Sequence, residues 1–151
     1  MGAFKMGLTT IIACIISATG FLIGRTIRKT CKDEIKTGEE ILRLTQNLAF
    51  GTLLTFLLIT ANLGLTLAIA ISTAYAAYSF LKKKGQNNTK TIIVAAIIAI
   101  TFRTSLFLYG AGTSFIYTLI TGIRTKSWRT TIKDATLLLA ATLTLIYLRT
   151  L

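Results

Sequence analysis

The sequence contains no proline and no histidine, and it has only five acidic residues against seventeen basic ones. Without histidine, the chain lacks the side chain that ordinarily exchanges protons near neutral pH and the commonest metal ligand. Its two cysteines, Cys14 and Cys31, are too few for a zinc or iron–sulfur site. We therefore expect a protein that is not an enzyme and that holds neither a metal nor a cofactor. Without proline, kinks in its helices have to come from Gly, Ser or Thr.

The few carboxylates all lie in or beside charged connectors. They are Asp33, Glu34, Glu39, Glu40 and Asp134. Proton- or sodium-coupled transporters and pumps usually hold a carboxylate inside the membrane. This distribution argues against that class of protein.

The sequence contains long apolar runs with almost no charged residues. No charged residue occurs from Thr45 to Leu81, and the only one from Thr91 to Ile123 is Arg103. A helix needs about 20 residues to cross about 30 Å of hydrocarbon. The runs do not alternate polar and apolar residues as the strands of a membrane barrel do. The sequence therefore predicts an all-α, multi-pass integral membrane protein.

We expect a single membrane domain over residues 1–151. Its parts are a signal-anchor-like helix (1–24), a charged connector with an amphipathic helix (25–44), one or more helical hairpins around a basic loop (45–123, with the loop at 82–90) and a terminal helix (134–149). Within the connector, Thr37 and Glu40 have the spacing of a capping box, which predicts a helix start near Gly38.

The two long runs allow two topologies. As one helix, Thr45 to Leu81 would extend about 55 Å, more than a bilayer core. Two such unusually long helices give about four transmembrane helices in total. If the chain instead reverses at Ala61–Gly64 ("ANLG") and at Tyr109–Gly112 ("YGAG"), there are up to six.

Positive charge bears on this choice. The connectors 25–44, 82–90 and 124–133 hold six, four and four basic residues. In the hairpin topology all three connectors lie on one side of the membrane, as the positive-inside rule favours, whereas two long helices would distribute them over both faces. The hairpin topology leaves Lys5 and Arg149 on the opposite side and buries Arg103.

Arg103 stands inside an otherwise apolar run. An arginine at the bilayer centre costs at least about 2.5–3.5 kcal/mol, so one interpretation is that it lines a pore or lumen or holds a lipid phosphate. The alternative is that it reaches to the interface and that the span begins at Thr104.

The basic connectors also predict contacts with lipid. Cations and tryptophan near the ends of membrane helices contact anionic headgroups. The candidate lipid- or lumen-facing residues are Lys82, Lys83, Lys84, Lys90, Arg103, Arg124, Lys126, Trp128 and Arg129. We therefore expect membrane lipids as partners and a bound phospholipid.

Small residues recur at helical spacing in the apolar runs. Such faces let helix backbones approach closely. The candidate packing residues are Gly20 and Gly24; Ala70, Ala74 and Ala77; and Gly110 and Ser114. They predict a packed bundle, a homo-oligomer or a subunit of a membrane complex.

The region from Thr45 to Ile123, two apolar runs joined by a short basic loop, resembles in outline the conjugative (type IV secretion) pilins. The resemblance implies a helical hairpin that binds lipid and presents its basic loop to a filament lumen, with nucleic acid as a partner. The extra helices at both ends depart from that outline. Three functions are thus expected: a non-enzymatic structural or accessory subunit of a larger membrane assembly, a pore-forming, channel or holin-like protein lined by Arg103 and the loop Lys82–Lys90, and a pilin-like filament subunit.

Overall fold

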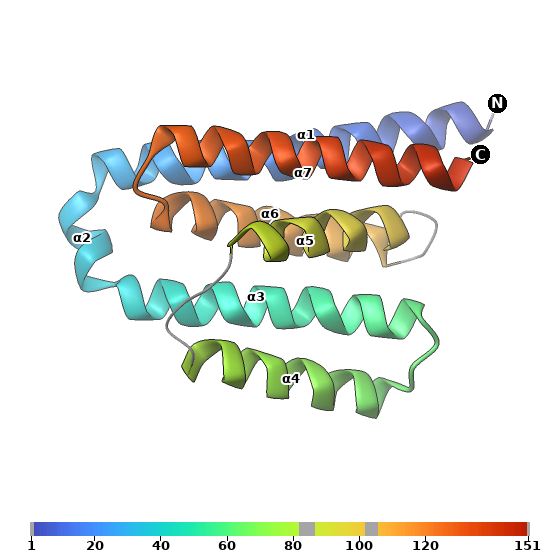
Figure 1. Ribbon diagram of the computed structural model, residues 1–151, viewed down its shortest axis with the longest axis horizontal. Helices are drawn as coiled ribbons and strands as arrows, with labels where there is room; N and C mark the ends of the chain where they lie inside the picture. The colour runs from blue at the N-terminus through green and yellow to red at the C-terminus, as the bar shows by residue number, and fades with distance from the viewer. Residues whose placement is uncertain (1, 82–86, 102–105, 151) are drawn as a thin grey trace.

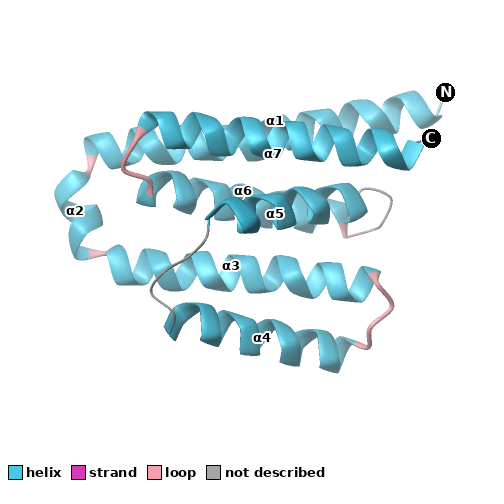
Figure 2. Cartoon of the chain, in the orientation of Figure 1, coloured by secondary structure: helices cyan, strands magenta, loops and turns pink. Residues whose placement is uncertain are grey.

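The computed structural model describes residues 2–81, 87–101 and 106–150, and within them the chain is all-helical with no strand, which confirms the all-α prediction (Figure 2). The seven helices of this described part are α1 (Gly2–Thr30), α2 (Lys32–Thr37), α3 (Glu39–Thr60), α4 (Leu65–Leu81), α5 (Asn87–Thr101), α6 (Phe107–Arg124) and α7 (Trp128–Thr150).

Six of these helices run side by side, and α2 connects α1 to α3 (Figure 1). The helices α1 and α7 form one edge of the molecule, α5 and α6 its middle, and α4 the opposite edge beyond α3. The helix α6 packs against α1, α3 and α5, whereas α5 packs mainly against α7 and α3. The beginning of α1 and the end of α7 lie at the same end of the bundle.

The first long run is two helices, so the expectation of one unusually long helix over Thr45–Leu81 is wrong. The helix α3 ends at Thr60 because Asn62 adopts a left-handed conformation, with φ of 62°. The amide of Leu63 then donates to the carbonyl of Leu58, and that of Asn62 to Ile59, both at 3.0 Å. This hydrogen-bond pair is the Schellman motif that commonly ends helices. The chain reverses at the expected "ANLG".

The second long run is also divided, but not where we expected. The helix α5 ends at Thr101 and α6 begins at Phe107, so the residues between them include Arg103, which lies outside the described part of the chain. The expected break at "YGAG" is wrong, because Gly110 and Gly112 lie within α6. Gly110 has a packing role instead: a β-carbon there would lie 3.2 Å from the Thr101 hydroxyl.

The outer helices are longer than expected. The helix α1 continues to Thr30 instead of ending near Gly24, and α7 begins at Trp128, not near Asp134. The added turns carry the charged residues. They can be helical because charged side chains at the end of a helix can still reach water. The helix α3 begins one residue after the predicted Gly38, but no side chain caps it. The Thr37 hydroxyl donates to its own helix at Asp33, so the predicted capping box is wrong.

The interior of the bundle is partly polar and its surface is largely aliphatic. The buried side chains include Phe21, Phe50, Ile98 and Tyr117, but also a series of Ser, Thr, Asn, Gln and Asp residues. Many buried threonines donate to the carbonyl four residues earlier, as expected for an apolar medium; Thr142, for example, donates to Leu138 at 2.7 Å. Exposed Ile and Leu side chains, in contrast, occur on every long helix.

Two helices of the described part are long and apolar enough to cross a membrane. They are the stretch Ile11–Thr30 of α1 and the whole of α3, Glu39–Thr60. Shorter apolar stretches occur at Leu65–Ser79 and Lys90–Thr101.

Candidate functional site

The described basic residues of the three connectors lie at one end of the bundle. The chain leaves α1 for α3, α4 for α5 and α6 for α7 at this end, whereas the α3–α4 turn lies at the other (Figure 1). The described basic residues of 25–43, Lys90 and 124–133 therefore lie together, and we call this the cationic end. Lys5 and Arg149 belong to the opposite ends of α1 and α7. The hairpin topology groups these described residues in the same way.

Two arginines of α1 hold the carboxyl end of α6. Arg28 donates from Nη1 to the carbonyls of Ile123 and Arg124 at 2.9 and 3.0 Å. Arg25 donates to the carbonyls of Thr125 and Lys126 at 3.0 and 2.8 Å. The last carbonyls of a helix have no partner within the helix and carry its negative dipole end. The two guanidinium groups therefore supply both hydrogen bonds and opposite charge where α6 ends.

A buried glutamine links α3 to α6. Gln46 is 3% exposed and donates from Nε2 to the Thr121 hydroxyl at 2.7 Å. Its Oε1 accepts a hydrogen bond from Nη1 of Arg124. The hydroxyl of the fully buried Tyr117 lies beside Gln46 and Thr121. The amide thus fixes the half-buried guanidinium of Arg124 at the inner side of the cationic end.

The neighbouring Asn47 holds the second cation. Lys90 donates from Nζ to Ser79 Oγ at 2.8 Å and to Asn47 Oδ1 at 3.5 Å, and Ser79 also donates to Asn47 Oδ1 at 3.2 Å. The ammonium lies 5.6 Å from the centre of the Phe50 ring, within cation–π range. Three helices, α3, α4 and α5, therefore converge on Lys90.

These contacts leave an excess of positive charge. The charges of Lys90 and Arg124 lie close enough to repel each other. Arg28 and Arg43 repel Arg124 as well, and Glu39 is the carboxylate that opposes them. Among the described residues, the side-chain hydrogen-bond partners of Lys90 and Arg124 are all neutral. We call Gln46, Asn47, Ser79, Lys90 and Arg124 the inner cationic cluster.

Two donors of the inner cationic cluster have no acceptor in the described structure. They are Nδ2 of Asn47, whose side chain is 5% exposed, and Nε of Arg124. Leaving a buried donor unsatisfied costs about 1–3 kcal/mol. Orphaned donors beside two cations are the groups that an oxyanion would satisfy.

The structure separates the candidate lipid- or lumen-facing residues into three groups. Lys90 and Arg124 are half-buried in the inner cationic cluster, whereas Lys126, Trp128 and Arg129 are exposed at the outside of the same end. Cζ of Arg25 lies 5.9 Å from the centre of the Trp128 ring. The predictions for Lys82, Lys83, Lys84 and Arg103 lie outside the described residues.

The glycines Gly20 and Gly24 pack inside the chain. A β-carbon at Gly20 would lie 3.0 Å from the Phe115 carbonyl oxygen, and one at Gly24 would lie 2.8 Å from the Ile123 amide nitrogen. Gly122 of α6 has the same close approach to the backbone of Phe21. These glycines therefore let α1 and α6 come into backbone contact. Of the other predicted pair, Gly110 packs on Thr101, and Ser114 is buried.

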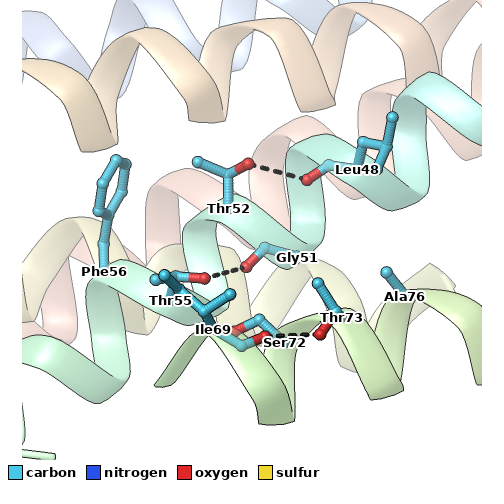
Figure 3. A pocket seen from close by; sticks show the side chains of 9 residues that line it. All are labelled: Leu48, Gly51, Thr52, Thr55, Phe56, Ile69, Ser72, Thr73 and Ala76. Carbon is cyan, nitrogen blue, oxygen red and sulfur yellow. Dashed lines mark hydrogen bonds between the residues drawn. The ribbon is translucent and has the colours of Figure 1, made fainter. Parts of the chain in front are cut away.

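The alanines Ala70, Ala74 and Ala77 of α4 are exposed. The face of α4 that packs on α3 carries Ala68 and Ser72 instead, both buried. Beside this contact lies a shallow groove between α3 and α4 (Figure 3), and its side chains are small, aliphatic or hydroxylated. The groove is lined by Leu48, Gly51, Thr52, Thr55, Phe56, Ile69, Ser72, Thr73 and Ala76. Its Thr and Ser hydroxyls donate to carbonyls of their own helices, for example Thr55 to Gly51 at 3.1 Å.

Sequence reasoning missed the buried polar residues that join the helices. Gln46 and Asn47 occur in an apolar run and carry no pattern that marks them as inward-facing. Asp134 is expected at the start of the terminal helix, beside a connector; it lies within α7 and is fully buried, with neither carboxylate oxygen hydrogen-bonded to a described residue. Within the described residues no group of three or more His, Cys, Asp or Glu could hold a metal ion.

Comparison of the chain with protein-family models, with curated proteins and with solved structures finds no match.

Proposed function

We propose that the chain is a multi-pass integral membrane protein, with six long helices in the bilayer and its cationic end in the cytoplasm. The observation that carries this proposal is the collection, at one end of the bundle, of the described basic residues of the three connectors: those of 25–43, Lys90 and those of 124–133. Lys and Arg flank the cytoplasmic ends of membrane helices, and a bundle with this asymmetry has one preferred orientation. Both termini would then lie on the opposite side.

The distribution of apolar side chains supports a lipid environment. Ile12, Ile16 and Leu67 are 48%, 51% and 58% exposed, whereas Gln46, Asn47 and several threonines are buried. A fold in water buries aliphatic side chains first, and extensive exposed apolar surface marks an interaction with membrane or partner. The helices α3, α4 and α6, with 22, 17 and 18 residues, extend about 33, 25 and 27 Å, which suits a bilayer core that is locally somewhat thin.

Within this arrangement, we propose a non-enzymatic structural or accessory role in a larger membrane assembly. The helix α4 packs mainly on α3, so its outer stripe Ala70, Ala74 and Ala77 is open to another transmembrane helix. Small residues are the side chains through which membrane helices associate. The exposed Lys126, Trp128 and Arg129 would contact anionic headgroups at the cytoplasmic interface.

The other two expected functions receive less support. A pore lined by Arg103 and the loop Lys82–Lys90 depends largely on residues outside the described part of the chain. The pilin-like outline needs two long helices over Thr45–Ile123, and the structure has four helices in that range.

Cysteine accessibility tests the orientation. In a background in which Cys14 and Cys31 are replaced by serine, we would compare Gly64→Cys, in the α3–α4 turn, with Ser127→Cys, at the cationic end. Gly64 has open space around it, and Ser127 is exposed. In intact bacterial spheroplasts a membrane-impermeant maleimide should label Gly64→Cys, and it should label Ser127→Cys only after lysis.

Two outcomes would overturn the proposal. One is a chain that stays in the soluble fraction without detergent. The other is equal labelling of the two cysteines in intact spheroplasts, because this would place both ends of the bundle on the same side of the membrane.

A further inference from the structure

We propose that the inner cationic cluster binds the phosphate group of a ligand. This inference rests on the proposed function, since it takes the cationic end to lie at the depth of lipid headgroups. It goes beyond general attraction of basic connectors to a membrane, because it assigns a defined site between α3, α4, α5 and α6.

The first argument is the charge balance. Lys90 and Arg124 are half-buried close to each other, and each is hydrogen-bonded to neutral side chains. Like charges are costly in a partly desolvated position unless a counter-charge lies near. Glu39 acts on Arg124 against Arg28, Arg43 and Lys90, so the positive charges outnumber it. A bound anion would restore the balance.

The second argument is the set of donors. Asn47 Oδ1 accepts from Ser79 and Lys90, which orients the amide and leaves Nδ2 as a buried donor without an acceptor. Arg124 Nε is a second such donor. Together with the ammonium of Lys90, they could serve an anion with several acceptor oxygens in different directions. A phosphate group fits this requirement, and Arg and Lys are its usual ligands in proteins.

The third argument is rigidity and access. Gln46 fixes Arg124, Ser79 and Asn47 fix Lys90, and the Phe50 ring lies under the ammonium, so the cations are held apart in set positions. Both cations are partly exposed, so a ligand can approach them from the cationic end. The phosphate could belong to an anionic phospholipid or to a soluble phosphate compound, and the experiment separates these sources.

The test measures thermal stabilisation of the purified full-length protein in an uncharged detergent. The probes are short-chain phosphatidylglycerol, inorganic phosphate and, as the phosphate-free control, short-chain diacylglycerol. A ligand that binds the folded state raises Tm with its concentration, which gives an apparent Kd. We expect a rise with phosphatidylglycerol and none with diacylglycerol. A rise with inorganic phosphate as well would assign the site to soluble phosphates, and its absence would assign it to the lipid headgroup.

The variant Lys90→Met should weaken the apparent Kd about tenfold or more, since it removes a charged hydrogen-bond donor. The matched control is Lys36→Met, which removes an exposed cation from α2 at the same end and should leave the Kd within about twofold of wild type. An unchanged apparent Kd in Lys90→Met, or an equal weakening of binding in both variants, would refute the proposed site.

A second measurement needs no variant. Acetylation of lysines in the wild-type protein, followed by mass spectrometry, should show Lys90 protected several-fold by the stabilising probe and Lys36 unaffected. Equal rates at Lys90 with and without the probe would contradict the inference. If the chain is embedded in a membrane but fails these tests, only the phosphate site is refuted. If the chain is soluble without detergent, the proposed function is refuted.

Discussion

Gly24 of α1 lies against the backbone of Leu119 in α6, so closely that a β-carbon at Gly24 would overlap the Leu119 carbonyl oxygen. The same carbon would lie 2.8 Å from the amide nitrogen of Ile123. Backbone atoms cannot move aside as a flexible side chain can. The two helices can therefore keep this crossing only if residue 24 has no side chain.

Replacing Gly24 by alanine should destabilise the protein by about 1–3 kcal/mol, the usual cost of overpacking a tight contact. The matched control is Gly112→Ala in α6, where a β-carbon meets nothing within 4 Å. That substitution should stabilise the helix by about 0.5–1 kcal/mol, because alanine is the better helix former. Thermal unfolding of both variants in detergent gives the comparison, and a loss of similar size in both would contradict the assigned contact.

The role of these glycines could be predicted only in part. The spacing of four residues between Gly20 and Gly24 predicts a close approach to another helix, and in the structure both glycines lie against the backbone of α6. The partner could not be read from the spacing, since a GxxxG face serves a second copy as well as another helix of the same chain. For α4, spacing favoured Ala70, Ala74 and Ala77, whereas the packed face is Ala68 and Ser72. The helix α4 carries small residues on all of its faces, so their spacing could not show which face packs against α3.

The turn after α3 depends on the left-handed conformation of Asn62. Replacing Asn62 by alanine should cost about 1 kcal/mol, because a β-carbon disfavours positive φ and asparagine tolerates it better. Asn62→Gly should be as stable as wild type within a few tenths of a kcal/mol, since glycine has no such penalty. Equilibrium unfolding of the three proteins checks this order. Equal stability of the alanine and glycine variants would contradict a φ-dependent turn.

Asn62 also shows why the helix breaks were hard to place. "ANLG" and "YGAG" look alike as breakers, yet the first ends a helix and the second lies inside one. In the first, Asn62 completes two hydrogen bonds that close α3. In the second, Gly110 removes bulk where α5 and α6 touch. Whether a glycine ends a helix or packs it depends on tertiary contacts that one sequence does not show.

The contacts of Arg25 with the end of α6 predict a specific loss on substitution. Arg25→Met should lower the free energy of unfolding by about 1–3 kcal/mol, because the carbonyls of Thr125, the C-cap of α6, and of Lys126, just beyond it, lose a charged donor. Arg25→Lys should recover part of this loss, since an ammonium cannot reproduce the geometry of the guanidinium fork. The control is Arg129→Met, an exposed arginine at the same end, which should change stability by less than about 0.5 kcal/mol. Equal effects at the two positions would show that net charge, not the contact, is responsible.

These arginines mark the limit of the sequence-based interpretation. Charge counting predicts that Arg25 and Arg124 lie at the same end of the bundle. It does not predict that one caps a helix and the other is held by Gln46, because each contact joins residues far apart in the chain. The same holds for Asn47 and Lys90, which meet only after three helices have packed.

Asp134 is fully buried in α7, and neither of its oxygens has a hydrogen-bond partner among the described residues. A buried carboxylate without a partner is costly, and far more so when it is charged than when it is neutral. Asparagine has nearly the same shape and carries no charge. Asp134→Asn should therefore be at least as stable as wild type, with a higher Tm at pH 8 measured in detergent.

The comparison that makes this prediction sharp is Asp33→Asn. Asp33 is exposed in the first turn of α2, where a negative charge is favourable, so its loss should lower Tm slightly or leave it unchanged. The two substitutions are chemically identical, but their effects on Tm should differ in sign, because one carboxylate is buried and the other is in water. A clear loss of stability in Asp134→Asn would mean that the charged form has a partner. Lys133, whose charge acts favourably on Asp134, would be the first candidate for that partner, and Asp134 would then be a binding group instead of a strained one.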